Sequence, residues 1–119
     1  FVTAVSRYTR HRFLSWASLP PHVVRVVPNT VQPRFRTAAR DPGFRKRLGI
    51  PSPDARILLT VSRLSHHDQY KGVDRVISVM HSVLEKIPDA VYCIAGDGDD
   101  VERLRFEAER QGVAAAVRF

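Results

Sequence analysis

The sequence has one cysteine, no long hydrophobic run and few acidic residues in its first half. Cys93 lies inside the apolar run 91–95, so we expect a buried thiol, no disulfide within the chain and a reducing compartment. No apolar stretch approaches the roughly 20 residues that cross a bilayer, and the first residues lack the basic leader of a signal peptide. These absences exclude disulfide-stapled, collagenous and low-complexity chains and favour a soluble piece. The missing initial Met and the strand-like end indicate a fragment of a longer polypeptide.

The 119 residues are enough for about one domain, and their charge is unevenly distributed. Residues 1–56 carry 11 Lys or Arg against two acids, whereas residues 57–119 carry 8 against 10. Arg outnumbers Lys 16 to 3, and Arg is the better bidentate partner for phosphate, although genome base composition produces the same bias. The basic first half is therefore either a solvated face or a surface for an anionic partner such as phosphate or acidic lipid.

The first half predicts a strand, a helix and a second strand, followed by an irregular basic segment. The strand covers 1–5, Ser6 caps the helix, and Phe13, Leu14, Trp16 and Ala17 form its apolar side until Pro20-Pro21 ends it. The second strand covers 23–27. Residues 29–41 have no apolar periodicity, so we interpret them as an interdomain linker. Asp41-Pro42 then begins a short basic helix, and Gly49 closes it.

The second half alternates strands and helices. Residues 57–61 form a continuous apolar run that is typical of a strand covered on both faces. A helical stripe follows, made of Val73, Val76, Ile77, Met80, Val83, Leu84 and Ile87. Residues 91–95 are the next strand, Asp99 and Glu102 resemble a capping box, Gly112 ends that helix, and 117–119 is a third strand. The predicted fold class is α/β, with a Rossmann-like parallel sheet flanked by helices.

Ligands of open parallel sheets bind at the carboxyl ends of the strands, so the loops after strands 57–61 and 91–95 are the candidate binding loops. In the loop after strand 57–61, we expect Arg63 to point toward the ligand cleft. Lys71-Gly72 then lies at the N-terminus of the helix that begins near Val73, which is the positive end of its dipole. These groups could hold one phosphate, and Gly72 would allow it to approach the backbone. Pairing of Arg63 and Lys71 with a nearby carboxylate, Asp68 or Asp74, explains them equally well.

The second loop, Gly96-Asp97-Gly98-Asp99-Asp100, is a weak glycine motif. It lacks the dinucleotide fingerprint, and its carboxylates would repel a diphosphate placed directly on it, so packing and capping are the default roles. Local capping also explains the acids better than a hard cation does. His66-His67-Asp68 has no third ligand in view for zinc, so we expect an exposed loop and no metal site.

Four short motifs occur in the order seen in group 1 (family 4) glycosyltransferases, and the chain resembles that family over nearly its whole length. They are Val5-Ser6-Arg7-Tyr8-Thr9, Val26-Val27-Pro28-Asn29-Thr30-Val31, Val61-Ser62-Arg63-Leu64 with Tyr70-Lys71-Gly72, and Ile94-Ala95-Gly96-Asp97-Gly98. The resemblance implies a fragment of a two-domain GT-B architecture. Residues 1–30 would end the N-terminal acceptor domain, 31–55 would form the linker and short basic helix, and 56–119 would open the C-terminal nucleotide-sugar domain.

The resemblance implies a hexose transfer from a nucleotide-diphosphate sugar to an acceptor hydroxyl, with retention and without a metal or other cofactor. Arg63 and Lys71 match the family's catalytic cations on the donor diphosphate, and the donor-binding set would be Ser62, Arg63, Lys71, Gly72, Gly96, Asp97 and Gly98. The acceptor would be a glycan or a lipid-linked sugar. The family usually has Gly at the positions of Ser62 and Thr30 and an acid at Gln32, so we expect the linker and the first phosphate loop to differ in detail.

Further expectations concern location and activity. The family's paired acidic motif would lie beyond Phe119, so we expect the fragment by itself to be inactive. A cytoplasmic protein that sits peripherally on the anionic inner face of the membrane fits the basic first half.

The competing hypothesis is a non-catalytic basic α/β module whose segment 34–47 binds nucleic acid or another polyanion. It depends on charge alone, since no nucleic-acid motif accompanies the arginines, and we therefore expect no nucleic-acid partner. A nicotinamide-binding Rossmann half is disfavoured because neither strand-to-helix turn carries the glycine fingerprint.

Overall fold

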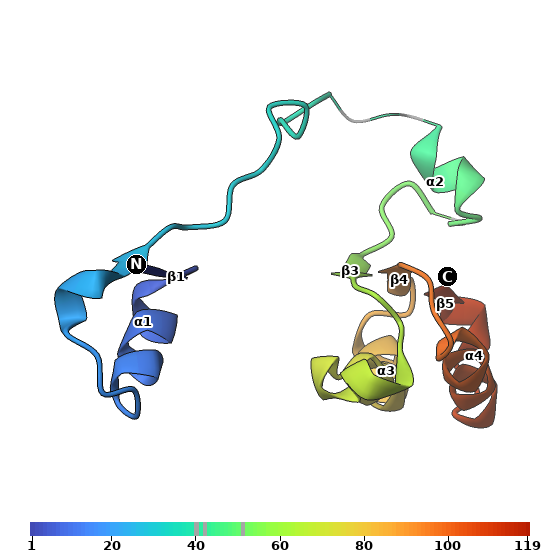
Figure 1. Cartoon of the computed structure of the whole chain (residues 1–119). Helices are drawn as coiled ribbons and strands as arrows, with labels where there is room; N and C mark the ends of the chain where they lie inside the picture. The colour runs from blue at the N-terminus through green and yellow to red at the C-terminus, as the bar shows by residue number, and fades with distance from the viewer. Residues whose placement is uncertain (40, 42, 51) are drawn as a thin grey trace. The chain divides into compact units, whose positions relative to one another are not determined.

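The computed structural model describes residues 1–39, 41, 43–50 and 52–119. The chain divides into two compact units, residues 1–40 and 41–119, and each contains a parallel sheet with helices (Figure 1). The predicted α/β class is therefore confirmed. Residues 43–50 and 52–55, which the sequence places in the linker, group with the second unit. None of the helices in the described residues combines the length and apolar character needed to cross a membrane.

The first unit is a small β-α-β arrangement. It consists of β1 (Val2–Ala4), α1 (Arg7–Leu14), the 3₁₀ turn η1 (Pro21–Val23) and β2 (Val24–Val26). The strands are parallel, with Val2 opposite Val24. Ser6 caps α1 as predicted, because its Oγ accepts a hydrogen bond from the Thr9 amide at 3.0 Å. Arg10 donates to the carbonyl oxygens of Val24 (2.9 Å) and Pro21 (2.7 Å), which ties the helix to β2.

The predicted length of the first helix is wrong. Helix α1 ends at Leu14, so Trp16 and Ala17 lie outside it, and Trp16 is exposed. Ser15 is the C-cap, and its hydroxyl donates to the Arg12 carbonyl at 2.7 Å. A serine side chain that bonds to the preceding turn offers the backbone an alternative to further helix.

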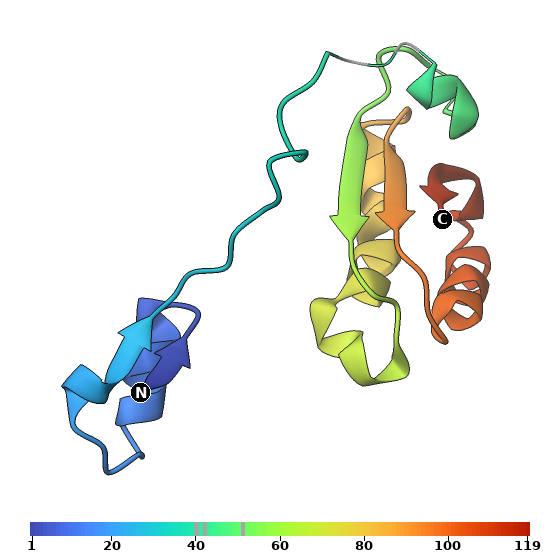
Figure 2. The same ribbon diagram turned by 45° about the horizontal axis from the view of Figure 1, so that its top comes forward.

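The second unit is a three-stranded parallel sheet whose strands are connected by helices that lie beside the sheet (Figure 2). Its elements are α2 (Phe44–Arg47), β3 (Ile57–Val61), the 3₁₀ segment η2 (His66–Lys71), α3 (Val73–Lys86), β4 (Val91–Ala95), α4 (Val101–Arg110), the 3₁₀ turn η3 (Ala114–Ala116) and β5 (Val117–Arg118). The strand order is β3-β4-β5, with Ile57 opposite Val91 and Tyr92 opposite Val117. The predicted strands and helices of this half are all present.

One face of the sheet carries the main core. Tyr92 and Ile94 of β4 are buried beneath α3 and α4, and the predicted stripe of α3 supplies Val73, Ile77 and Met80 to the same cluster. Other buried members are Leu64, Leu104, Ala108, Val113 and Val117. The Tyr92 hydroxyl is hydrogen-bonded to Thr60 Oγ1 at 2.8 Å, so the buried polar group has a partner on β3.

The opposite face is covered mainly over β4. Val91 and Cys93 pack with Ile50 and Ala55 of the segment that follows α2. Arg118 of β5 holds this segment in place by donating to the carbonyl oxygens of Leu48 (3.1 Å) and Gly49 (3.2 Å). Cys93 is buried as predicted, and burial raises the pKa of its thiol.

The prediction that residues 57–61 are covered on both faces is wrong. Ile57, Leu59 and Val61 are 37%, 64% and 75% exposed. They share the sheet face of Val91 and Cys93, but the cover described above lies over β4, while α3 and α4 lie on the opposite face.

The predicted C-terminal end of α2 is confirmed, whereas its predicted start is not. Gly49 closes α2 at φ +60°, with the Ile50 amide donating to the Arg45 carbonyl at 3.0 Å, as in a Schellman motif. The predicted start at Asp41 is wrong: α2 begins at Phe44, with Gly43 as its N-cap residue and no side-chain cap. The Asp41 carboxylate accepts from the Gly43 amide at 2.8 Å, and Pro42 lies outside the described residues.

The predicted capping box of α4 is wrong. Asp100 rather than Asp99 is the N-cap residue, and no side chain caps the helix. The Asp99 carboxylate instead accepts from the His66 amide at 3.1 Å. Gly112 follows α4 at φ +68°, as expected for a helix-ending glycine.

Candidate functional site

The loops after β3 and β4 run side by side at the carboxyl edge of the second sheet. The Ser62 amide donates to the Ala95 carbonyl (3.0 Å), and the Leu64 amide donates to the Asp97 carbonyl (2.9 Å). The Asp100 amide returns a bond to the Leu64 carbonyl (3.0 Å). These bonds extend the parallel pairing of the strands beyond their ends, so Arg63 is carried on a fixed backbone.

Gly96 and Gly98 permit this close approach. A Cβ atom at Gly96 would lie 1.8 Å from the Ser62 carbonyl oxygen, and one at Gly98 would lie 1.9 Å from the Leu64 carbonyl oxygen. No real Cβ atom reaches such distances, so only glycine fits at either position. Both glycines therefore serve contact between the two loops, in agreement with the packing role that the sequence favoured as the default.

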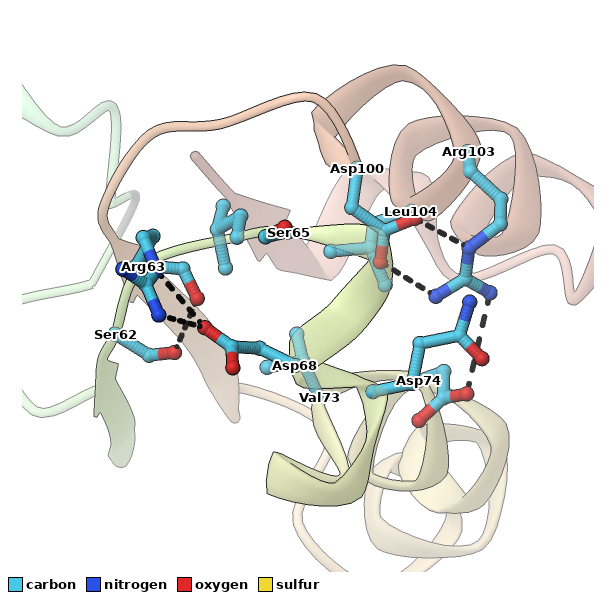
Figure 3. Close-up of a pocket in the computed structure, with 11 residues that line it drawn as sticks. Ser62, Arg63, Ser65, Asp68, Val73, Asp74, Asp100, Arg103 and Leu104 are labelled. Atoms are coloured by element: carbon cyan, nitrogen blue, oxygen red, sulfur yellow. Dashed lines mark hydrogen bonds and ion pairs between the residues drawn. The ribbon is translucent and has the colours of Figure 1, made fainter.

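Arg63 and Lys71 converge on a single oxygen atom. Arg63 Nε and Nη2 each lie 2.9 Å from Asp68 Oδ2, and Lys71 Nζ lies 2.9 Å from the same oxygen. The Arg63 side chain is 73% exposed, whereas those of Lys71 and Asp68 are only 27% and 10% exposed. Figure 3 shows the Arg63 and Asp68 side chains pointing toward each other within this loop. The predicted convergence of the cations is thus present, with the predicted alternative partner, Asp68, at its centre.

The local backbone explains why Lys71 and Asp68 meet. Both belong to η2, three residues apart, and the backbone is kinked at Asp68 (φ −106°, ψ 16°), with its carboxylate 2.9 Å from Lys71 Nζ. Gly72 ends η2 in the left-handed conformation at φ +72° and is the N-cap of α3. An added Cβ at Gly72 would meet only ordinary contacts with Arg75, so its backbone angle rather than space calls for glycine.

A second charged cluster, formed around Asp100, borders the same cavity as the cluster of Arg63, Asp68 and Lys71. Asp100 is buried and accepts two hydrogen bonds from Arg103, at Nε (2.6 Å) and Nη2 (2.7 Å). His66 Nδ1 lies 2.9 Å from the same carboxylate, and Arg103 also reaches Asp74 at 3.9 Å. Arg103 is the main cause that holds the pKa of Asp100 below its usual range. This cluster links α4, η2 and α3, and so fixes the loops that carry the cations.

A small cavity lies between the two clusters and is lined by both (Figure 3). Its volume is about 10 Å³, which is room for about one water molecule and not for a nucleotide. The open side of Arg63 is therefore the surface on which a larger anion would have to lie.

The other predicted site residues surround this arrangement. Ser62 is half-buried and donates from Oγ to the Arg63 carbonyl at 2.7 Å. Asp97 is exposed, and its carboxylate accepts from the Gly98 amide at 2.8 Å, within its own turn. The structure thus brings Ser62, Arg63 and Lys71 together, while the Asp97 side chain is engaged locally.

Sequence reasoning did not assign a site role to Asp100 and Arg103, and it gave Asp68 only as an alternative partner. Asp68 and Asp74 both lie three residues from Lys71, so spacing did not choose between them. Asp100 and Arg103 are also three residues apart, which is a local signal for their pairing, whereas the contacts of Asp100 with His66 and of Arg103 with Asp74 are tertiary. In the part of the chain that the structure describes, no three His, Cys, Asp or Glu side chains are grouped to hold a metal ion.

A sequence model of the family described as "Glycosyl transferases group 1" matches residues 43–119. The chain belongs to the group 1 glycosyl transferases. This membership and the Rossmann-like GT-B fold that the sequence resemblance implied are therefore confirmed. The matched region includes both loops and the site cations Arg63, Lys71 and Arg103.

Individual relatives agree with the family match. The chain is 34% identical over 122 residues to a GDP-mannose-dependent alpha-(1-6)-phosphatidylinositol monomannoside mannosyltransferase of Mycolicibacterium smegmatis, covering 99% of this chain and 30% of that protein. It is 31% identical over 118 residues to one of the subunits of human phosphatidylinositol N-acetylglucosaminyltransferase, covering 99% of this chain and 22% of that protein. This group 1 chain thus spans less than a third of the length of these curated relatives.

The fold also resembles a solved structure. The crystal structure of WaaG, a glycosyltransferase involved in lipopolysaccharide biosynthesis, superimposes with a TM-score of 0.74 at 20% identity. The likeness covers 97% of this chain and 31% of WaaG. At this identity the likeness supports the fold.

Proposed function

We propose that the full-length protein carrying this chain is a glycosyltransferase that moves a hexose from a nucleoside-diphosphate sugar to an acceptor hydroxyl with retention. The observation that carries the proposal is the convergence of Arg63 and Lys71 on one oxygen at the carboxyl edge of the sheet. Two cations that lie 2.9 Å from one anionic oxygen also suit a phosphate oxygen in that position. Membership of the group 1 family supports the reaction class.

In the proposed reaction the bond between the anomeric carbon and the phosphate oxygen breaks, and its electron pair stays on the phosphate. The acceptor hydroxyl oxygen forms the new bond on the same face, and its proton passes to the departing diphosphate. Negative charge therefore grows on the leaving group in the transition state. Arg63 and Lys71 would stabilise that charge, and for this reason we propose that no metal ion or other cofactor is required.

Alanine variants of Arg63 and Lys71 in the full-length protein test this proposal. Each should lower turnover on the order of 10²-fold, because each removes one contact to the developing charge. GDP-mannose is the first donor to assay, since it is named for the mycolicibacterial relative. Arg75→Ala is the matched control, because Arg75 is an exposed cation on the neighbouring helix α3. Wild-type turnover in either site variant would rule out the assigned role.

The acceptor is proposed to be a lipid-linked sugar or an inositol phospholipid on an anionic membrane. Both curated relatives above carry phosphatidylinositol in their names, and residues 1–56 hold 11 cations against two acids. The protein would then act from the cytoplasm at the inner face of the membrane. Sedimentation with vesicles of phosphatidylcholine, alone or mixed with phosphatidylglycerol, tests this: binding should require the anionic lipid and weaken with salt. Equal binding to neutral vesicles would contradict it.

A further inference from the structure

The position of Asp68 has a consequence for nucleotide binding that goes beyond the role of the two cations. Its Oδ2 atom receives Arg63 Nε, Arg63 Nη2 and Lys71 Nζ, all at 2.9 Å. Under the proposed function, a donor diphosphate oxygen would need the same donors. Under that function the carboxylate lies where a diphosphate oxygen would bind.

The backbone holds this carboxylate in place. The Asp68 amide donates to the Ser65 carbonyl at 2.8 Å, and the neighbouring His66 amide is tied to Asp99 Oδ1 of the second loop. Asp68 itself has φ −106° and ψ 16°, a kink within η2. These bonds tie the backbone of η2 to the second loop, so the Asp68 backbone stays beside Arg63 and Lys71.

Charge decides the direction of the effect. Lys71 and then Arg63 hold the pKa of Asp68 below its usual range, so the group is ionised at neutral pH. An incoming diphosphate must share the two cations with this carboxylate and is repelled by it. Arg63, with 73% of its side chain exposed, is free to turn from Asp68 toward a ligand.

We propose that Asp68 is a positioning residue that competes with the diphosphate for Arg63 and Lys71 and thereby weakens the binding of the nucleoside-diphosphate product. The inference rests on the proposed function. Its effect is to promote release of the product after transfer, since the carboxylate recaptures both cations as the diphosphate leaves.

The test is calorimetric titration of GDP into the full-length protein and its Asp68→Asn variant. Asn keeps the size of the side chain and removes its charge, so the variant should bind GDP about tenfold more tightly. Asp68→Glu, which keeps the charge, should restore affinity toward the wild-type value. Asp89→Asn removes one carboxylate at the opposite edge of the sheet, before β4, and should leave the affinity within about twofold.

Tighter binding is the readout that a purely structural role of Asp68 would not give, because a disrupted loop binds more weakly. Unchanged or weaker GDP affinity in Asp68→Asn overturns the inference, and Asp68→Ser replaces this variant if it does not fold.

Arg63→Ala and Lys71→Ala separate this inference from the proposed function. If they weaken GDP binding while Asp68→Asn does not strengthen it, only the inference fails. If they leave GDP binding unchanged, or if wild-type protein binds neither GDP, UDP nor ADP, the diphosphate site and the inference fail together.

Discussion

Replacing Gly98 by Ala should detach the two loops that carry the candidate site. The added Cβ would lie 1.9 Å from the Leu64 carbonyl oxygen and 2.6 Å from its carbonyl carbon. Both are backbone atoms, so no side chain can turn aside to make room. One loop must move away from the other by more than an ångström to restore an ordinary contact.

The cost follows from the bonds that this movement breaks. Leu64 donates to Asp97 at 2.9 Å and accepts from Asp100 at 3.0 Å, and each such bond contributes about 1 kcal/mol net. The φ of +150° at Gly98 adds about 1 kcal/mol for any residue with a side chain. The loop pair should therefore be weakened by about 3 kcal/mol, which corresponds to roughly a 10²-fold increase in local opening.

Amide hydrogen exchange measures this opening directly in the full-length protein. In Gly98→Ala the amides of Leu64 and Asp100 should exchange roughly 10²-fold faster than in the wild type. Nucleotide affinity should fall as well, because Arg63 lies on the displaced loop. Gly112→Ala is the control: its φ is +68°, but no heavy atom lies within 4 Å of the added Cβ. That variant should be destabilised by about 1 kcal/mol without faster exchange at Leu64. Wild-type protection of both loop amides in Gly98→Ala would refute the reasoning.

Three further predictions concern stability. Asp100→Ala should lower the free energy of unfolding by about 1–3 kcal/mol, measured by thermal unfolding, because Arg103 and His66 lose their shared partner. The pKa of Asp100 is lowered by folding, chiefly by Arg103, so its contribution should be full above its unfolded pKa of about 3.9 and lost as the pH falls through the lower folded value. The stability gap between wild type and Asp100→Asn should accordingly shrink in acid. Tyr92→Phe should cost about 1 kcal/mol in the same assay, because the 2.8 Å bond to Thr60 is lost.

Two exposed positions provide controls for these predictions. Glu102→Ala removes an acid from the first turn of α4, and Tyr70→Phe removes a hydroxyl from η2, with both side chains in solvent. Each should change stability by less than about 0.5 kcal/mol. Equal losses in the control and the buried variant would show that burial and hydrogen bonding are not the cause. An acid dependence that is the same in wild type and Asp100→Asn would contradict the assignment to Asp100.

Periodicity predicted the second sheet well because its strongest signals are local. The predicted stripe gives one buried side of α3, where Val73, Ile77 and Met80 are buried, but its last member, Ile87, is the C-cap residue and is exposed. The strand 91–95 was equally clear, since Val91 to Ile94 are apolar or aromatic and all four are buried. Both α3 and β4 pack in the main core, so the residues that their sequence patterns predict to be buried are buried.

The errors arose where a local pattern had more than one solution. The run 57–61 is apolar throughout, but hydrophobicity does not reveal which neighbour covers which face, and Leu59 is 64% exposed. Asp99 and Glu102 have the spacing of a capping box, yet the His66 amide, 33 residues away in sequence, takes the Asp99 carboxylate. A tertiary donor thus replaced the local one, and spacing alone does not foresee it.

The glycine turn after β4 shows why the sequence predicted where the site lies but not which contacts form it. Gly96 and Gly98 suit either a backbone that approaches a ligand or one that approaches another loop. The distances of 1.8 and 1.9 Å to the carbonyl oxygens of Ser62 and Leu64 support the second role. Because these two residues flank Arg63, the glycines act on the proposed diphosphate site through the backbone of that arginine. Substitutions in the glycine turn should therefore affect nucleotide affinity even though the packing they disturb lies between the two loops.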